Sequence, residues 1–161
     1  IKEAVEQVRA GQEQVRTEAA RLVGALRASP KARGRWGEQQ LRNVLEMAGL
    51  AEHVDFATEV STSTDDGRLR PDVIVRLPGG RQLVIDAKCS MNAYLDACEA
   101  TDDTARMAFL EAHARALRTH ADSLGRKAYW DQFAGTADYV MMFIPGEQFL
   151  SGALEADAGL W

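Results

Sequence analysis

Apolar residues recur through the first 26 positions at alternating spacings of four and three, which is a heptad pattern. Gln12 is its one polar position, and the pattern ends before Ser29-Pro30, where proline terminates a helix. The spacing predicts a coiled-coil helix over residues 1–29 that pairs with a second copy in a homo-oligomer, because so narrow a stripe needs a partner helix. Alternatively, this helix folds back on the rest of the chain. The seam comprises Ile1, Val5, Val8, Gln12, Val15, Ala19, Leu22 and Leu26.

Beyond Pro30 the pattern indicates shorter elements of both kinds. A second helix opens at Gly34, turns an apolar face that includes Leu41 and Leu45 toward the domain, and stops at Gly49. Alternating or apolar runs predict strands at 54–60, 71–77, 82–88 and 139–144, and helices are expected at 93–99 and 104–124. This order predicts an α/β domain over residues 31–161 with a mixed central sheet flanked by helices.

In the hairpin formed by the second and third predicted strands, the number of residues in the loop decides which side chains share a face. Apolar residues alternate on both strands, and their apolar faces coincide only if the connecting loop has an odd number of residues. A three-residue loop, Pro78-Gly79-Gly80, pairs Val73 with Ile85 and places Asp72 directly opposite Asp86. Two carboxylates on one face, with Cβ atoms about 5 Å apart, repel each other unless a positive charge lies between them.

Two sources of positive charge are open at this point. A hard divalent cation, Mg²⁺ or Mn²⁺, binds carboxylate oxygens together with water and substrate phosphate, which predicts Asp72 and Asp86 as metal ligands. Lys88 shares a face with Asp86 and either neutralises the pair without metal or orients a water and stabilises a phosphoryl transition state. Glu38 is a third carboxylate, which either leans toward the sheet as a ligand or pairs locally with Arg42.

Composition and charge narrow the class of protein. The 161 residues are 46% apolar, enough to bury a core, and no run is long enough to span a bilayer. Cys89 and Cys98 form neither a disulfide framework nor a zinc pattern, so a reducing, cytoplasmic location is expected. Because the chain starts at Ile1 and stops at Trp161 after a motif-rich stretch, we expect a fragment of a longer protein, and a membrane anchor upstream stays open.

Positive charge is concentrated although the net charge is −5. Residues 21–50 carry six basic and two acidic residues, which is compatible either with phosphate contacts through Arg33 and Arg35 or with a solvated basic face. The stretch 126–130 interleaves basic and aromatic residues, including Lys127 and Tyr129, as single-strand binding proteins do; alternatively, its aromatic residues pack into the core.

These residues resemble a known family. Pro71-Asp72 followed by Asp86-Ala87-Lys88 is similar to the PD-(D/E)xK nuclease signature, and the wider pattern over residues 33–150 resembles the DNA recombination protein RmuC family. The matching segments are Gly34-Arg35-Trp36-Gly37-Glu38, Arg70-Pro71-Asp72-Val73, Val84-Ile85-Asp86-Ala87-Lys88, His120 with Lys127, Tyr129 and Trp130, and Phe143-Ile144-Pro145-Gly146-Glu147.

The resemblance implies a restriction-endonuclease-like core behind a coiled coil, in a domain that continues past Trp161. It also implies a DNA endonuclease that limits rearrangement at inverted repeats and has no small-molecule substrate. Its catalytic residues would be Glu38, Asp72, Asp86 and Lys88, with Glu38 completing the metal site. The main alternative is a coiled-coil scaffold whose degenerate nuclease fold binds DNA without cutting it. A purely structural oligomer with a Lys88–Asp86 salt bridge is a third possibility.

Overall fold

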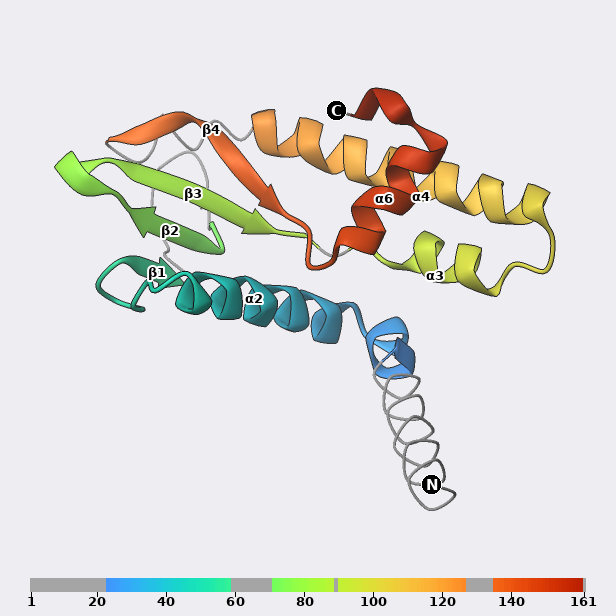
Figure 1. Cartoon of the computed structure of the whole chain (residues 1–161), viewed down its shortest axis with the longest axis horizontal. Coiled ribbons are helices and arrows are strands. Elements are labelled where there is room, and N and C mark those ends of the chain that lie inside the picture. The colour runs from blue at the N-terminus through green and yellow to red at the C-terminus, as the bar shows by residue number, and fades with distance from the viewer. Residues whose placement is uncertain (1–22, 59–70, 89, 127–134, 161) are drawn as a thin grey trace, which may run out of the picture.

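The computed structural model describes residues 23–58, 71–88, 90–126 and 135–160. Helix α2 (Pro30–Met47) covers one face of a four-stranded sheet, and the C-terminal half of α4 (Asp103–Arg126) packs on the other (Figure 1). The predicted mixed α/β architecture is therefore confirmed. The predicted coiled-coil segment up to residue 22 lies outside the described residues. None of the helices described here is long and apolar enough to cross a bilayer.

The sheet has the order β1-β2-β3-β4 and combines both strand directions. Strands β1 (Phe56–Thr58), β2 (Val73–Arg76) and β3 (Gln82–Ala87) are antiparallel neighbours, whereas β4 (Thr136–Phe143) runs parallel to β3. The chain crosses from β3 to β4 through α3 (Asn92–Glu99) and α4. The strand expected from the unbroken apolar sequence at 139–144 is present as β4, at the edge of the described sheet. Two of its large apolar side chains, Tyr139 and Met141, are exposed.

The β2–β3 hairpin has the register that its sequence predicts. Pro78–Gly80 forms the three-residue turn (η1), and the Leu77 N–H donates to the Arg81 carbonyl at 2.8 Å. Gly79 and Gly80 have φ values of 78° and 74°, which explains why two glycines occupy this turn. Val73 pairs with Ile85, as the three-residue loop predicts.

Helix α2 begins at Pro30, four residues before the predicted start at Gly34. Ser29 Oγ accepts the Ala32 N–H at 3.2 Å, and proline fits the first helical position because its missing N–H would have no helical partner. The predicted apolar face is confirmed, since Leu41 and Leu45 are buried. They pack in one cluster with Phe56, Val73, Val75 and Ile85.

Residues 23–28 are helical and meet α2 at an angle across Ser29 (Figure 1). Leu26, the last position of the heptad seam, is only 4% exposed and packs with Met91, Leu95 and Phe149. Arg27 forms salt bridges with two acidic residues of α3, at 2.6 Å to Asp96 and 2.8 Å to Glu99. The end of the N-terminal helix is therefore held against α3 and α6 (Glu147–Ala156), a helix that the sequence pattern did not predict.

Candidate functional site

Asp72 lies one residue before β2, directly across from Asp86 in the hairpin register. Its backbone has left the strand, and its Oδ2 accepts the backbone N–H of Ala87 at 2.7 Å. A side chain thus completes the ladder at this end of the sheet. The bond fixes the Asp72 carboxylate beside the residue that precedes Ala87, which is Asp86.

Asp86 is 3% exposed, and two basic side chains approach the same carboxylate oxygen. Its Oδ2 lies 3.6 Å from Lys88 Nζ and 3.4 Å from His120 Nε2. Lys88 comes from the end of the same strand, as expected, whereas His120 projects from α4. His120 was expected only from the family resemblance, because nothing in its local spacing indicates a partner 34 residues earlier.

Different helices cover the two faces of the sheet, and Asp86 does not lie on the face that α2 covers. Asp86 alternates with Ile85 and shares its face with Val84, which packs with Ile74 and Leu124 of α4. Helix α2, which carries Glu38, covers the opposite face. Glu38 therefore does not reach Asp86 across a shared face. It meets Asp72 at the end of the sheet, where Asp72 has bent out of the strand.

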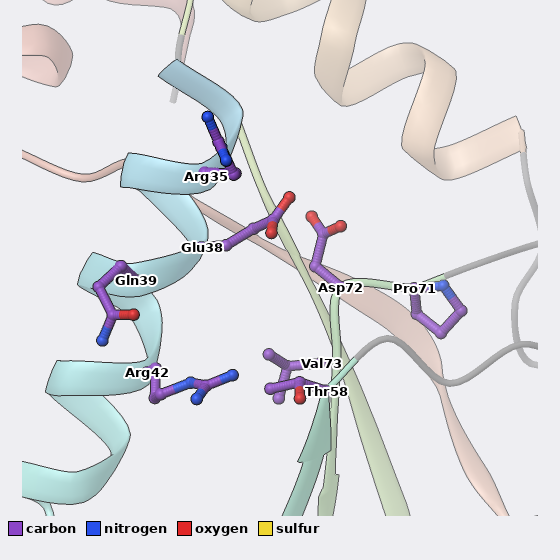
Figure 2. A pocket seen from close by; sticks show the side chains of 8 residues that line it. All are labelled: Arg35, Glu38, Gln39, Arg42, Thr58, Pro71, Asp72 and Val73. Carbon is purple, nitrogen blue, oxygen red and sulfur yellow. The ribbon is translucent and has the colours of Figure 1, made fainter. Parts of the chain in front are cut away.

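A cleft of about 390 Å³ separates α2 from the start of β2. Figure 2 shows the carboxylates of Glu38 and Asp72 pointing toward each other across this cleft. Within the described part of the chain, neither a hydrogen bond nor an ion pair holds Glu38. The local Glu38–Arg42 pair is not formed, because Arg42 Nη2 instead lies 3.2 Å from Glu52 Oε1. The cleft is lined by Arg35, Glu38, Gln39, Arg42, Thr58, Pro71, Asp72 and Val73.

The pKa of Asp72 is raised from an ordinary 3.8 to about 6. Burial is the largest cause, followed by the negative charge of Asp86, and Glu38 adds a smaller repulsion. The Ala87 N–H and the Lys88 charge act in the opposite direction and only partly offset this rise. Asp86 and Glu38 therefore both act on the Asp72 carboxylate, and burial and repulsion together outweigh the Ala87 N–H and the Lys88 charge.

The donor types at this site fit a hard cation. Carboxylate oxygens are preferred ligands of Mg²⁺, and the bond to Ala87 engages one of the two Asp72 oxygens. Among the described residues, no three His, Cys, Asp or Glu side chains converge as a ready-made metal cage. The arrangement fits a cation held by one or two carboxylates and completed by water or phosphate, which is the usual coordination of Mg²⁺ in phosphoryl-transfer sites.

The predicted phosphate contacts fall into two groups. Arg35 is exposed at the cleft, whereas Arg33 is half-buried and its Nη1 donates to the carbonyls of Leu26 and Arg27 at 2.8 and 3.1 Å. Arg33 therefore also joins α2 to the preceding helix. Lys127 and Tyr129, the other two predicted nucleic-acid contacts, lie outside the described residues.

Comparison with known proteins places the chain among one set of sequences. The model of the RmuC family matches residues 1–161. The chain is 59% identical over 157 residues to the DNA recombination protein RmuC homolog of Zymomonas mobilis, covering 98% of this chain and 35% of that protein. It is 46% and 45% identical over 145 residues to the DNA recombination protein RmuC of Salmonella typhimurium and of Escherichia coli K12. These two matches cover 88% of this chain and 30% of each relative, so the chain spans about a third of the length of these proteins. No solved structure matches.

Proposed function

The chain belongs to the RmuC family, and on that premise we propose that it carries a Mg²⁺- or Mn²⁺-dependent endonuclease site that acts on DNA phosphodiester bonds. The observation that carries the proposal is the opposition of Asp72 and Asp86 at the sheet end, with Lys88 Nζ 3.6 Å from Asp86 Oδ2. Paired carboxylates can hold a cation for metal-assisted phosphodiester hydrolysis, and a neighbouring lysine can offset the charge of the phosphate.

In this proposal the site residues have separate tasks. Asp72 and Asp86 would hold the cation, and Glu38, which lines the cleft together with Asp72, would have to turn toward it to become a third ligand. The cation supplies Lewis-acid stabilisation of the phosphate oxygens. Lys88 orients the attacking water and offsets negative charge on phosphate. The water oxygen forms a bond to phosphorus, the bond from phosphorus to a deoxyribose oxygen breaks, and that oxygen leaves with a proton.

The surrounding parts of the chain fit the same task. Arg35 at the mouth of the cleft contacts the DNA backbone, together with Arg33, Lys127 and Tyr129. The proposed domain has a restriction-endonuclease-like core, and the heptad segment before it joins two or more copies. The relatives are named DNA recombination proteins. Limiting rearrangement at inverted DNA repeats is what the family resemblance implies, and we propose that role for the longer protein.

A cleavage assay tests the proposal. Supercoiled plasmid carrying an inverted repeat is incubated with the chain and Mg²⁺, and nicked and linear products are measured. Wild type is expected to cleave, and Asp72→Asn and Lys88→Ala are expected to lose cleavage. Lys31→Ala removes a lysine from an exposed position on the same helix as Glu38 and is expected to cleave like wild type. Wild type that stays inactive with Mg²⁺ and Mn²⁺ would contradict the proposal.

Binding without cleavage is the second candidate, and one observation favours it. Asp86 Oδ2 already lies 3.6 Å from Lys88 Nζ, which compensates its charge without a cation, and 3.4 Å from His120 Nε2. In that case the chain binds DNA without producing nicks, and its affinity for DNA is the same in Mg²⁺ and in EDTA. The same plasmid assay, run beside a filter-binding measurement, separates the two candidates.

A further inference from the structure

A second pocket, on the α4 side of Asp86, has a different chemical character from the cleft at Asp72. Its volume is about 290 Å³, and it lies between the end of β3, the start of α3 and the middle of α4. Three of its lining side chains are basic: Arg33, Lys88 and His120. Ser90 and Asn92 add polar groups, and no acidic side chain of the described residues lines it, although the chain carries a net charge of −5.

The basic side chains of this pocket are held in place by the fold. Arg33 Nη1 donates to the carbonyls of Leu26 and Arg27, which fixes the guanidinium while Nη2 and Nε remain for a ligand. Lys88 Nζ is positioned by Asp86 at 3.6 Å. Little side-chain entropy is then lost when an anion binds between them. Helix α3 begins at Asn92, and no side chain caps its first turn, so the positive end of the helix adds to the same field.

We infer that this pocket, which we call the phosphate pocket (Arg33, Lys88, Ser90, Asn92 and His120), binds a phosphate group of the DNA strand next to the site of cleavage. Lys88 lines the phosphate pocket and also contacts Asp86, so the bound phosphate is a near neighbour of the scissile one. The inference rests on the proposed function and deepens it, because it assigns a subsite that fixes the strand relative to the carboxylates. A terminal phosphate and an internal backbone phosphate have the chemistry that this pocket recognises.

The test uses one isosteric substitution that adds a negative charge inside the pocket. Asn92→Asp is suited to it because Asn92 is exposed and an acidic residue at the first position of a helix favours folding. Gln148→Glu is the matched control, since it makes the same amide-to-acid change in the first turn of α6, outside the phosphate pocket. Binding of a labelled single-stranded oligonucleotide with a 5′-phosphate is measured by fluorescence anisotropy in EDTA, so that no cleavage occurs.

Asn92→Asp is expected to weaken binding about tenfold, the loss of roughly one charge-assisted contact, and Gln148→Glu is expected to bind like wild type. If the effect is restricted to strands with a 5′-phosphate, the pocket takes a terminal phosphate; if it is equal on circular single-stranded DNA, the pocket takes an internal one. Equal affinity of both variants and wild type would overturn the inference, as would absence of DNA binding by wild type.

The two proposals fail in distinguishable ways. Weakened binding by Asn92→Asp in a chain that never cleaves DNA leaves the phosphate pocket in place and removes the nuclease. Cleavage by wild type, combined with unchanged binding and cleavage by Asn92→Asp, removes the phosphate pocket alone.

Discussion

Asp72 Oδ2 accepts the backbone N–H of Ala87 at 2.7 Å. A side-chain oxygen, rather than a backbone carbonyl, thus continues the hydrogen bonding between β2 and β3. The bond holds the Asp72 carboxylate next to Asp86, where burial and repulsion raise its pKa to about 6. Holding the Asp72 and Asp86 carboxylates close together lowers the free energy of unfolding of the metal-free chain. Such a loss is typical of a binding site, where a cation restores the balance.

Replacing Asp72 with asparagine is expected to stabilise the metal-free chain. The amide oxygen of the substituted side chain can still accept the Ala87 N–H, while the repulsion with Asp86 disappears. Because Asp72 is partly solvated, the gain at pH 7.5 is on the order of 1 kcal/mol after allowance for solvent screening. Chemical denaturation measures it. Asp138→Asn, at an exposed position of the edge strand β4 away from the three carboxylates, is the control and is expected to change little.

The same carboxylate gives a pH dependence with a definite sign. The raised pKa means that the folded state binds more protons than the unfolded state between about pH 4 and pH 6. The contribution of Asp72 to the free energy of unfolding is therefore greatest below pH 4 and is lost as the pH rises through 6. The stability difference between Asp72→Asn and wild type is expected to grow over this interval and to stay constant above it. A difference independent of pH from 4 to 8 would contradict the assigned pKa.

The hairpin around this site was predictable because strand alternation and glycine turns are local rules. Two apolar faces, an odd loop and two adjacent glycines were sufficient to predict the pairing of Val73 with Ile85, which the structure confirms. Which helix covers which face is not a local property. The sequence pattern therefore predicted the apolar side of α2 but not that Asp86 would face α4.

The heptad pattern left open whether the N-terminal helix pairs with a second copy or folds back on the chain, and long-range packing answers this for the end of the helix. Leu26 continues the spacing of the seam, yet it is buried within this chain against Met91, Leu95 and Phe149. His113 is likewise fully buried in α4, and its Nε2 lies 2.8 Å from the Phe149 carbonyl. Both contacts involve α6, which the sequence did not predict, so neither was accessible from spacing alone.

Truncation separates the proposed coiled coil from the helix end that packs on the domain. Removing residues 1–22 is expected to leave the melting temperature nearly unchanged while converting an oligomer to a monomer in analytical ultracentrifugation. Leu26→Ala in that shortened chain is expected to cost about 2–4 kcal/mol, since the side chain is 4% exposed. A monomeric intact chain at tens of micromolar would contradict the coiled coil, and a silent Leu26→Ala would contradict the packing.

Arg35 is the cleaner probe of DNA contact at the cleft, because it is exposed and Arg33 also supports the preceding helix. Arg35→Gln is expected to weaken DNA binding irrespective of sequence and to lower the log–log salt slope by about 1, without changing the melting temperature. Arg115→Gln is the control, since Arg115 is exposed on α4 and pairs only weakly with Glu111 at 3.6 Å. Equal salt slopes for the two variants would assign Arg35 to a solvated basic face.

The claim that Asp72 and Asp86 form a divalent-cation site is tested most directly by anomalous diffraction from crystals of the chain soaked in Mn²⁺. We expect an anomalous peak bounded by the carboxylates of Asp72 and Asp86, with Glu38 turned toward it across the cleft. The peak is expected to be lost in crystals of Asp72→Asn. An anomalous map without a peak there, in crystals where Lys88 and His120 still face Asp86 Oδ2, would contradict the cation site and assign these residues to a structural salt bridge.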